Sequence, residues 1–445
     1  MSAERLRVDT RIDARWFVPI DRDGALPDHS LLVDDERIVA LLPRAEADER
    51  YAAREHVDLA LHHVVMPGLV NAHTHAGMTL MRGIADDVAL DAWLCEHIWP
   101  RESAHVSTEF VYDGTAIAAA EMLCGGTTCC SDMYFHADAA ARAYLAAGMR
   151  AVLAAPVIDF PMAGAADADA HLRRGLAVRD AFRTSTRLSF ALAPHAPYTV
   201  GDASWRKVVT LAHELDLPIE THLQETRGEV DDALAADGCT PLARLDRLGA
   251  TGPSLVAVHA VHLGNGDLDI LAQHGCHVVH CPTSNLKLAA GIAPVAAYAA
   301  RGVNVALGTD GAASNNRLDM FGEMRRAALL AKGLSGDASV LPAQAVLRMA
   351  TQNGADAFGL GARIGSLAAG KFADVIAIDL STIATQPCYD PVSQLVYAAG
   401  REHVTDVWVS GERVVASRIP TRIDVDTLAA HAHRWHSLLA GATTR

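Results

Sequence analysis

The sequence predicts an α/β fold, a (β/α)8 TIM-type barrel with a small β-sandwich domain built from both ends of the chain. Apolar, β-rich runs alternate with helical stretches through the middle of the chain, which is typical of a parallel sheet. Eight such runs occur within about 300 residues, and eight strands close a barrel. Short alternating β-patterns also lie near both chain ends, which indicates a second, smaller domain.

The eight barrel strands are expected where short runs of apolar and β-favouring residues are bounded by Gly, Pro or polar residues. These runs are 64–70, 127–133, 150–157, 188–193, 218–221, 254–258, 277–281 and 304–308. Amphipathic helices are expected between them, for example at 115–124, 168–182, 205–215, 240–248 and 268–274. An open, doubly wound sheet is the alternative architecture with the same alternation.

The small β-domain is expected to combine residues 1–65 and 365–425. Its strands are expected within 8–42, 373–379 and 404–415, where apolar residues alternate with polar ones and turn signals interrupt them. The barrel then covers residues 66–364. Residues 426–445 are expected to form a C-terminal helix and tail.

Composition excludes several classes of protein. Half of the 445 residues are apolar, which is enough for a large buried core. The formal net charge of −15, without a basic cluster, argues against nucleic acid polymers and membranes as partners. Since neither a signal-peptide pattern nor an apolar stretch of about 18 residues occurs, we expect a cytoplasmic protein. The eight cysteines contain no C-x-x-C pair, which favours reduced thiols.

Polar residues cluster at the predicted carboxyl ends of the strands, where barrels of this class carry their chemistry. His73 and His75 follow the first strand, and residues i and i+2 of an extended strand point to the same side, so both imidazoles can bind one metal ion. Four more polar strand ends contain imidazoles and carboxylates, at 194–198, 220–226, 259–262 and 308–316. Three imidazoles and one carboxylate predict a ligand set for a divalent metal, with space for water.

These motifs resemble the amidohydrolase superfamily, in particular its cytosine deaminase-like and chlorohydrolase-like branch. The resemblance extends over about 66–374, and the flanking segments match the small β-domain of that family. It implies four metal ligands and one further histidine beside the attacking water. The implied ligands are His73, His75, His222 and Asp310, and the further histidine is His259.

The end of the fourth strand indicates the number of metal ions, and the imidazole ligands indicate their kind. Dinuclear members of the superfamily carry a carboxylated lysine there, whereas this chain has His195 and only four lysines, all elsewhere. We therefore expect one metal ion per chain. Zinc is favoured because imidazole suits it and because it lowers the pKa of a bound water to about 7. Ferrous iron is the alternative, since neither the ligands nor their spacing exclude it.

Glu225 favours deamination. It follows His222 by three positions, within reach of both the attacking water and a ring nitrogen of a substrate. Resemblance to the deaminases implies that Asp310 and His259 hold and deprotonate the water, which attacks the amine-bearing carbon. Glu225 would then protonate the adjacent ring nitrogen before ammonia leaves. The expected catalytic residues are thus Glu225, His259 and Asp310.

The segments 93–102, 194–198 and 284–288 look like those of the methylthioadenosine and S-adenosylhomocysteine deaminases. That resemblance implies three substrate-binding residues. Glu102 would bind both ribose hydroxyls, Trp93 would pack beside the ligand, and His195 would contact the nucleoside. A carboxylate that accepts two adjacent hydroxyls favours a riboside over a free base.

The expected activity is therefore zinc-dependent hydrolytic deamination of 5′-methylthioadenosine, S-adenosylhomocysteine or adenosine to the inosine analogue and ammonia. One alternative is a deaminase or chlorohydrolase of a free base (guanine, cytosine) or an s-triazine, which would not need Glu102. A non-catalytic barrel assembly protein is an alternative of another class, and it would lack the ligand set. We also expect a homo-oligomer, a dimer or a tetramer.

Overall fold

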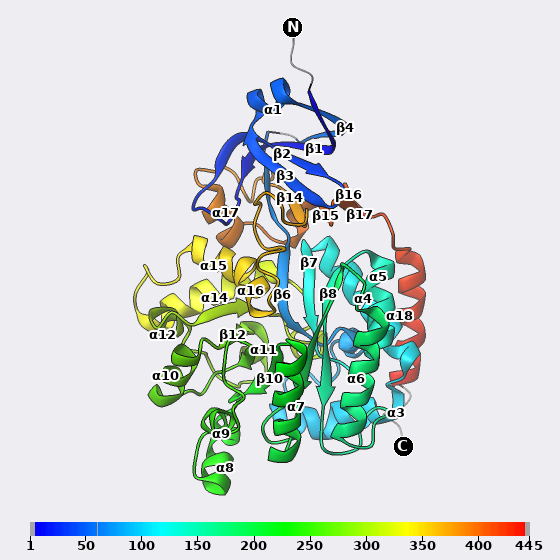
Figure 1. The fold of residues 1–445 in the computed structure, drawn as a ribbon, viewed down its shortest axis with the longest axis vertical. Coiled ribbons are helices and arrows are strands. Elements are labelled where there is room, and N and C mark those ends of the chain that lie inside the picture. The colour runs from blue at the N-terminus through cyan, green and yellow to red at the C-terminus, as the bar shows by residue number, and fades with distance from the viewer. Residues whose placement is uncertain (1–4, 60, 441–445) are drawn as a thin grey trace.

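The computed structural model describes residues 5–59 and 61–440. Its framework is an eight-stranded parallel barrel and a separate nine-stranded mixed sheet. Figure 1 shows the mixed sheet at the top of the view, where blue strands from the N-terminal part lie beside orange and red strands from the C-terminal part. The predicted TIM-type barrel with a β-domain from both chain ends is confirmed.

The barrel strands follow one another in space in the order of the sequence, each hydrogen-bonded to the next. Their positions agree with the predicted runs to within a few residues, except at the first strand. The strands are β6 (Leu69–Thr74), β7 (Thr127–Asp132), β8 (Arg150–Val157), β9 (Leu188–Pro194), β10 (Ile219–Leu223), β11 (Leu255–His259), β12 (His277–His280) and β13 (Asn304–Leu307).

The residues just after the last strand, β13, bond to the first strand of the barrel, β6. The Asp310 N–H donates to the carbonyl oxygen of His73 at 3.0 Å, and the Thr309 N–H donates to Asn71 Oδ1 at 2.9 Å. These bonds bring the two ends of the eight-stranded sheet together, which excludes the open doubly wound alternative. They also place the ends of β6 and β13 beside each other, where three of the predicted metal ligands lie, His73, His75 and Asp310.

Helices surround the barrel and bury its strands. Those inserted between or after the barrel strands are η1 (Ala76–Met81), α2 (Leu90–Ala92), η2 (Trp93–Ile98), α3 (Trp99–His105), α4 (Thr108–Cys124), α5 (Ala137–Ala147), α6 (Ala168–Phe182), α7 (Asp202–Leu215), α8 (Arg227–Asp237), α9 (Pro241–Arg247), α10 (Asn265–His274), α11 (Pro282–Lys287), α12 (Val295–Ala300), α13 (Ala312–Asn315), α14 (Met320–Ser335), α15 (Ala343–Met349) and α16 (Gln352–Ala357). Several begin at a residue whose side chain accepts a backbone N–H bond, such as Ser107, Asp167 and Thr240.

The mixed sheet joins the two ends of the chain through one pair of strands, β5 and β14, which run antiparallel. Its strands are β1 (Leu6–Phe17), β2 (Leu26–Asp34), β3 (Arg37–Pro43), β4 (Tyr51–Asp58), β5 (His63–Pro67), β14 (Val375–Asp379), β15 (Val404–Val409), β16 (Glu412–Ala416) and β17 (Ile419–Pro420). The remaining helices, which lie before β5 or after β14 in the sequence, are α1 (Arg44–Arg50), α17 (Pro391–Tyr397), η3 (Arg401–His403) and α18 (Val425–Ala440).

The predicted first barrel strand, 64–70, consists of two strands that belong to different sheets. β5 pairs with β14 in the mixed sheet as far as Pro67, whereas β6 begins the barrel at Leu69. Gly68 separates them, and a Cβ at this position would lie only 2.0 Å from Thr128 Oγ1. The mixed sheet therefore extends past the expected boundary at residue 65, because the Pro-Gly pair ends one strand and the crowded glycine starts the next.

A buried ion pair ties the barrel to the mixed sheet. Arg150 at the start of β8 donates to Asp374, next to β14, through Nε at 2.7 Å and Nη2 at 3.1 Å. Both side chains are 2% exposed, and the Arg150 guanidinium also donates to Ser410 Oγ. Since a charge without a partner is costly in the interior, the two sheets are held in one relative position by this pair.

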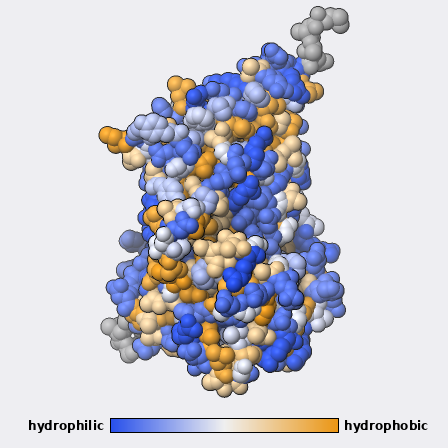
Figure 2. All heavy atoms as spheres, turned by 90° about the vertical axis from the view of Figure 1, so that its left-hand side faces the viewer, coloured by the Kyte–Doolittle hydropathy of each residue, from blue (hydrophilic) through white to orange (hydrophobic). Residues whose placement is uncertain are grey.

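Much of the face in Figure 2 is hydrophilic, with apolar residues in smaller groups between the polar ones. Within the described residues, no helix has the length and apolar character needed to cross a membrane.

Replacing Asp374 with alanine is expected to lower the free energy of unfolding by about 3–5 kcal/mol, since it leaves the buried Arg150 charge unpaired. Chemical denaturation would measure this loss. The exposed pair Arg142–Asp138 is the control, and Asp138→Ala is expected to cost about 1 kcal/mol or less. Equal losses in the two variants would show that the buried pair does not hold the sheets together.

Candidate active site

The carboxyl ends of the barrel strands surround one cavity with about 800 Å³ of empty space, part of it open to solvent. The predicted site residues that line it are His75, Trp93, Glu102, His195, His222, Glu225, His259 and Asp310. His73 is fully buried directly beside them, with its ring centroid 4.7 Å from that of His75. The structure thus brings together all nine side chains that the sequence singled out.

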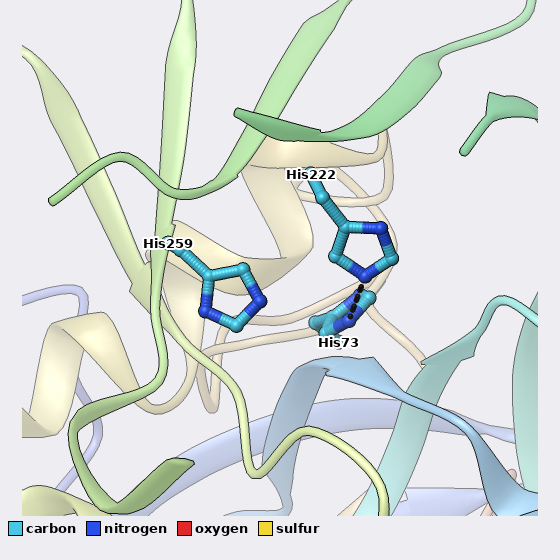
Figure 3. A group of neighbouring side chains, drawn as sticks. All are labelled: His73, His222 and His259. Atoms are coloured by element: carbon cyan, nitrogen blue, oxygen red, sulfur yellow. Dashed lines mark hydrogen bonds between the residues drawn. The ribbon is translucent and has the colours of Figure 1, made fainter. Parts of the chain in front are cut away.

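Two overlapping groups of side chains in this cavity have ligand atoms close enough to hold a metal ion, and His73 belongs to both. One consists of His73, His222 and His259, and the other of His73, His75 and Asp310, with the ligand atoms of each group within 4.8 Å of one another. Figure 3 shows the rings of the first group converging from three strands, with Nε2 of His73 and Nε2 of His222 3.2 Å apart.

The outer nitrogen of each ring has its own partner, which turns the inner nitrogen toward the cavity. Nδ1 of His73 lies 2.6 Å from Glu220 Oε1, and Nδ1 of His75 lies 2.6 Å from the carbonyl oxygen of Met133. Nδ1 of His222 lies 2.8 Å from the carbonyl oxygen of His195. An imidazole that donates from Nδ1 to such an acceptor presents its Nε2 lone pair, which is the arrangement that metal-binding histidines use.

Asp310 is held as a carboxylate. Ser284 and Ser314 each donate a hydroxyl to its Oδ2 at 2.7 Å, and its Oδ1 lies 3.2 Å from His75 Nε2. Burial raises the pKa of Asp310, but hydrogen bonds from His73 and His75 lower it well below its usual range. One oxygen is therefore fixed by hydroxyls while the other faces the histidines.

The charges at this point favour a cation, which is the test of whether a divalent metal fits. Burial lowers the pKa of His73, yet the adjacent carboxylates of Asp310 and Glu220 raise it to about 9, so they stabilise positive charge at this ring. A divalent cation supplies such charge, and three imidazoles with a carboxylate are ligands that zinc accepts. The residues present therefore fit a divalent metal.

Glu225 lies in the loop between β10 and α8, and its Oε2 is 3.7 Å from His259 Nε2. Burial raises the pKa of Glu225 well above its usual range, and the carboxylates of Asp310 and Glu229 raise it further. Burial also lowers the pKa of His259 to about 4, and its Nδ1 lies 2.8 Å from Asn285 Oδ1. Burial thus favours the protonated form of Glu225 and the neutral form of His259, a pair suited to moving protons.

Glu102 of α3 lines the same cavity and is 5% exposed. The Tyr134 hydroxyl donates to its Oε1 at 2.7 Å. Burial raises the pKa of Glu102 to about 7, although the bond from Tyr134 lowers it. Trp93 is also buried here, and within the described residues its Nε1–H has no hydrogen-bond partner. His195 stands beside His222, with ring centroids 4.9 Å apart.

Sequence reasoning missed the residues that orient the predicted ones. Glu220 lies in the polar segment 220–226 without a predicted role, although an acid two positions before His222 in a buried strand points to the same side and so into the barrel. Ser284 and Asn285 lie in a segment whose resemblance was noted without a role. Ser314 and Tyr134 gave no signal, because a hydroxyl becomes a partner only through the tertiary fold.

A family model described as "Amidohydrolase family" matches residues 64–414. A relative named 5-methylthioadenosine/S-adenosylhomocysteine deaminase, from Teredinibacter turnerae, is 46% identical over 433 residues, covering 97% of this chain and 98% of that protein. The chain belongs to the amidohydrolase family. A relative of the same name from Saccharophagus degradans is 43% identical and covers 96% of both chains. The prediction of an amidohydrolase of the deaminase type is thereby confirmed.

Solved structures of the amidohydrolase family have the same fold. A crystal structure of an adenosine deaminase from Xanthomonas campestris with bound zinc has a TM-score of 0.97 and 47% identity, covering 98% of this chain and 100% of that one. An atrazine chlorohydrolase from Arthrobacter aurescens complexed with zinc has a TM-score of 0.89 at 22% identity, covering 96% of this chain and 99% of its own. The latter likeness concerns the fold alone.

The metal ligands can be told apart from the neighbouring histidine by substitution. His222→Ala is expected to lower the affinity for zinc by more than about 100-fold, because it removes one of the four predicted ligands. His259→Ala is expected to keep one zinc per chain, since we assign its ring to the attacking water. Metal analysis after competition with a chelator measures both, and loss of zinc from His259→Ala would instead make that ring a ligand.

Proposed function

We propose that the protein catalyses zinc-dependent hydrolytic deamination of an adenine riboside, 5′-methylthioadenosine, S-adenosylhomocysteine or adenosine, to the inosine analogue and ammonia. The observation that carries the proposal is that two buried acids, Glu225 and Glu102, line one cavity. Glu225 lies beside the predicted metal ligands, where the reaction takes place, and Glu102 belongs to a separate helix. The relatives named above, called deaminases of such nucleosides, support the same substrate class.

The metal is assigned to His73, His75, His222 and Asp310, one ion per chain. Zinc is the first choice, in line with the zinc in the Xanthomonas campestris structure, and ferrous iron is the alternative. When bound, such an ion lowers the pKa of a water to about 7 and supplies a nucleophile at neutral pH. The other steps belong to side chains of this chain.

Asp310 and His259 take the proton of the attacking water, since both face the cavity and both are free of a proton at neutral pH. Glu225 gives its proton to the ring nitrogen next to the amine-bearing carbon, which the raised pKa of its carboxyl permits. The proton taken from the water then passes to the amine, which leaves the tetrahedral carbon as ammonia, and the hydroxyl left on that carbon returns its proton to Glu225. Burial of the acid and the base keeps bulk water from competing for these protons.

Glu102, Trp93 and His195 are assigned to the substrate. The carboxylate of Glu102 would accept both ribose hydroxyls in charge-assisted bonds, while the Trp93 ring packs beside the ligand and His195 contacts the nucleoside. The wall of the cavity also contains Trp99, Phe160, Met162 and Leu288, which suit an apolar 5′-substituent such as methylthio.

A cytoplasmic location and a homo-oligomeric state remain predictions.

The first test is ammonia release and loss of the adenine absorbance band with 5′-methylthioadenosine, compared with adenosine, S-adenosylhomocysteine, guanine, cytosine and an s-triazine. Ribosides are expected to react and free bases not.

Glu225→Gln is expected to lower kcat by about 10²- to 10⁴-fold with unchanged zinc content, because the proton donor is lost. Metal-loaded protein that leaves every riboside unchanged would refute the proposal.

The pH dependence tests the role of Glu102. As pH falls from about 8 to about 5, Glu102 gains a proton and accepts hydroxyls less well, so kcat/KM for adenosine relative to 2′,3′-dideoxyadenosine is expected to fall. The ratio cancels protonations that affect both substrates equally. In Glu102→Gln the ratio is expected to be low at every pH, and a pH-dependent ratio in that variant would contradict the role.

A further inference from the structure

The carboxylate of Glu229 is hydrogen-bonded to the backbone of the loop that contains Glu225. It lies in the first turn of α8, and its two carboxylate oxygens accept bonds from two consecutive backbone N–H groups. Oε1 accepts from Gln224 N–H at 2.9 Å and Oε2 accepts from Glu225 N–H at 2.9 Å. Since each oxygen has one partner, the carboxylate fixes the backbone on both sides of the Gln224 Cα.

This use of the carboxylate differs from ordinary helix capping. The sequence T-x-x-E at 226–229 is a capping-box pattern. In that pattern the side chain of the acid accepts a hydrogen bond from the backbone N–H of the N-cap residue, which here is Thr226. Half of that pattern is present, since Thr226 Oγ1 accepts from Glu229 N–H at 3.2 Å. The Glu229 carboxylate instead reaches past Thr226 to the two preceding residues. The helix start is therefore coupled to the backbone of the proposed proton donor.

The gripped backbone has a conformation that needs support. Gln224 has a φ of +48°, in the left-handed region that residues other than glycine rarely adopt. Its fully buried side chain accepts from Leu242 N–H at 2.9 Å and donates to the carbonyl oxygen of His262 at 2.8 Å. The Gln224 side chain thus anchors the loop from one side and Glu229 from the other, and together they set the direction in which Glu225 leaves the strand.

We propose that Glu229 is a positioning residue that aims Glu225 at the reacting atoms by holding the backbone of Gln224 and Glu225. This inference rests on the proton-transfer role proposed above for Glu225. Glu229 is not among the residues that line the cavity, it belongs to neither metal-ligand group, and its carboxylate holds the loop backbone, so it acts through Glu225. Burial raises the pKa of Glu229 to about 7, although the bonds from the Gln224 and Glu225 N–H groups lower it, so its carboxylate form predominates above about pH 7.

The test is a double-mutant cycle on zinc-loaded enzyme. In Glu229→Gln the amide nitrogen faces a backbone N–H that has lost its acceptor, so kcat is expected to fall about 10- to 100-fold, with KM within about twofold and zinc content unchanged. Because Glu229 acts through Glu225, the double variant Glu225→Gln/Glu229→Gln is expected to be no slower than Glu225→Gln alone. If Glu229→Gln does not fold, Glu229→Asp takes its place in the cycle.

Two controls separate positioning from stability. Asp231→Asn removes an exposed carboxylate from the same helix and is expected to keep wild-type kcat. Asp167→Ala removes the N-cap of another helix, α6, so it is expected to lower the melting temperature while kcat stays near wild type.

The outcomes distinguish the inference from the function on which it rests. A Glu229→Gln enzyme that melts earlier but keeps wild-type kcat, or losses that add in the double variant, would overturn the positioning role alone. Wild-type turnover in Glu225→Gln would overturn the proton-transfer role and the positioning role together. A large loss in Glu225→Gln, a smaller one in Glu229→Gln and no added loss in the double variant support both.

Discussion

In the middle of the barrel, the carboxylate of Glu220 on β10 reaches across the interior to two other strands. It meets His73 Nδ1 on β6 and the hydroxyl of Ser131 on β7, each at 2.6 Å, and it has no solvent exposure. A buried carboxylate has to be neutralised and hydrogen-bonded. The His73 ring meets this need, and in doing so turns its other nitrogen toward the cavity, so one internal charge orients the centre of the ligand set.

The active site is also a place of backbone strain. His259, Ala260 and Asp310 have φ values of +68°, +49° and +61°, and all three stand where a barrel strand ends. Such conformations cost on the order of 1–3 kcal/mol each and persist only where surrounding bonds determine them. At Asp310, hydrogen bonds hold the strained conformation: its carboxylate accepts from the N–H of Gly311 and from two serine hydroxyls. The strained backbone at these strand ends lowers the stability of the fold, and it orients the side chains of the active site.

The barrel could be predicted from the sequence because its strands depend on short-range patterns, whereas His222 and Asp310 were assigned as ligands through the resemblance to the amidohydrolase superfamily. Strand runs show in apolar periodicity, and a histidine pair such as His73 and His75 shows in its spacing. The division of 64–70 into two strands was missed, since an apolar run looks the same whichever sheet it joins. The partners that orient the ligands were missed for a related reason: Ser131 and Ser314 are ordinary serines until the closed barrel brings them to a carboxylate.

The pairing of β5 with β14 has a consequence for synthesis on the ribosome. β5 leaves the ribosome early, but its partner β14 lies roughly 300 residues later in the chain, which is about 15–60 s of translation at 5–20 residues per second. During that interval the Val64-Val65-Met66 run presents an apolar strand edge with no partner on the β14 side. Unpaired edges of this kind attract other strands, so this edge is open to wrong pairing until β14 arrives.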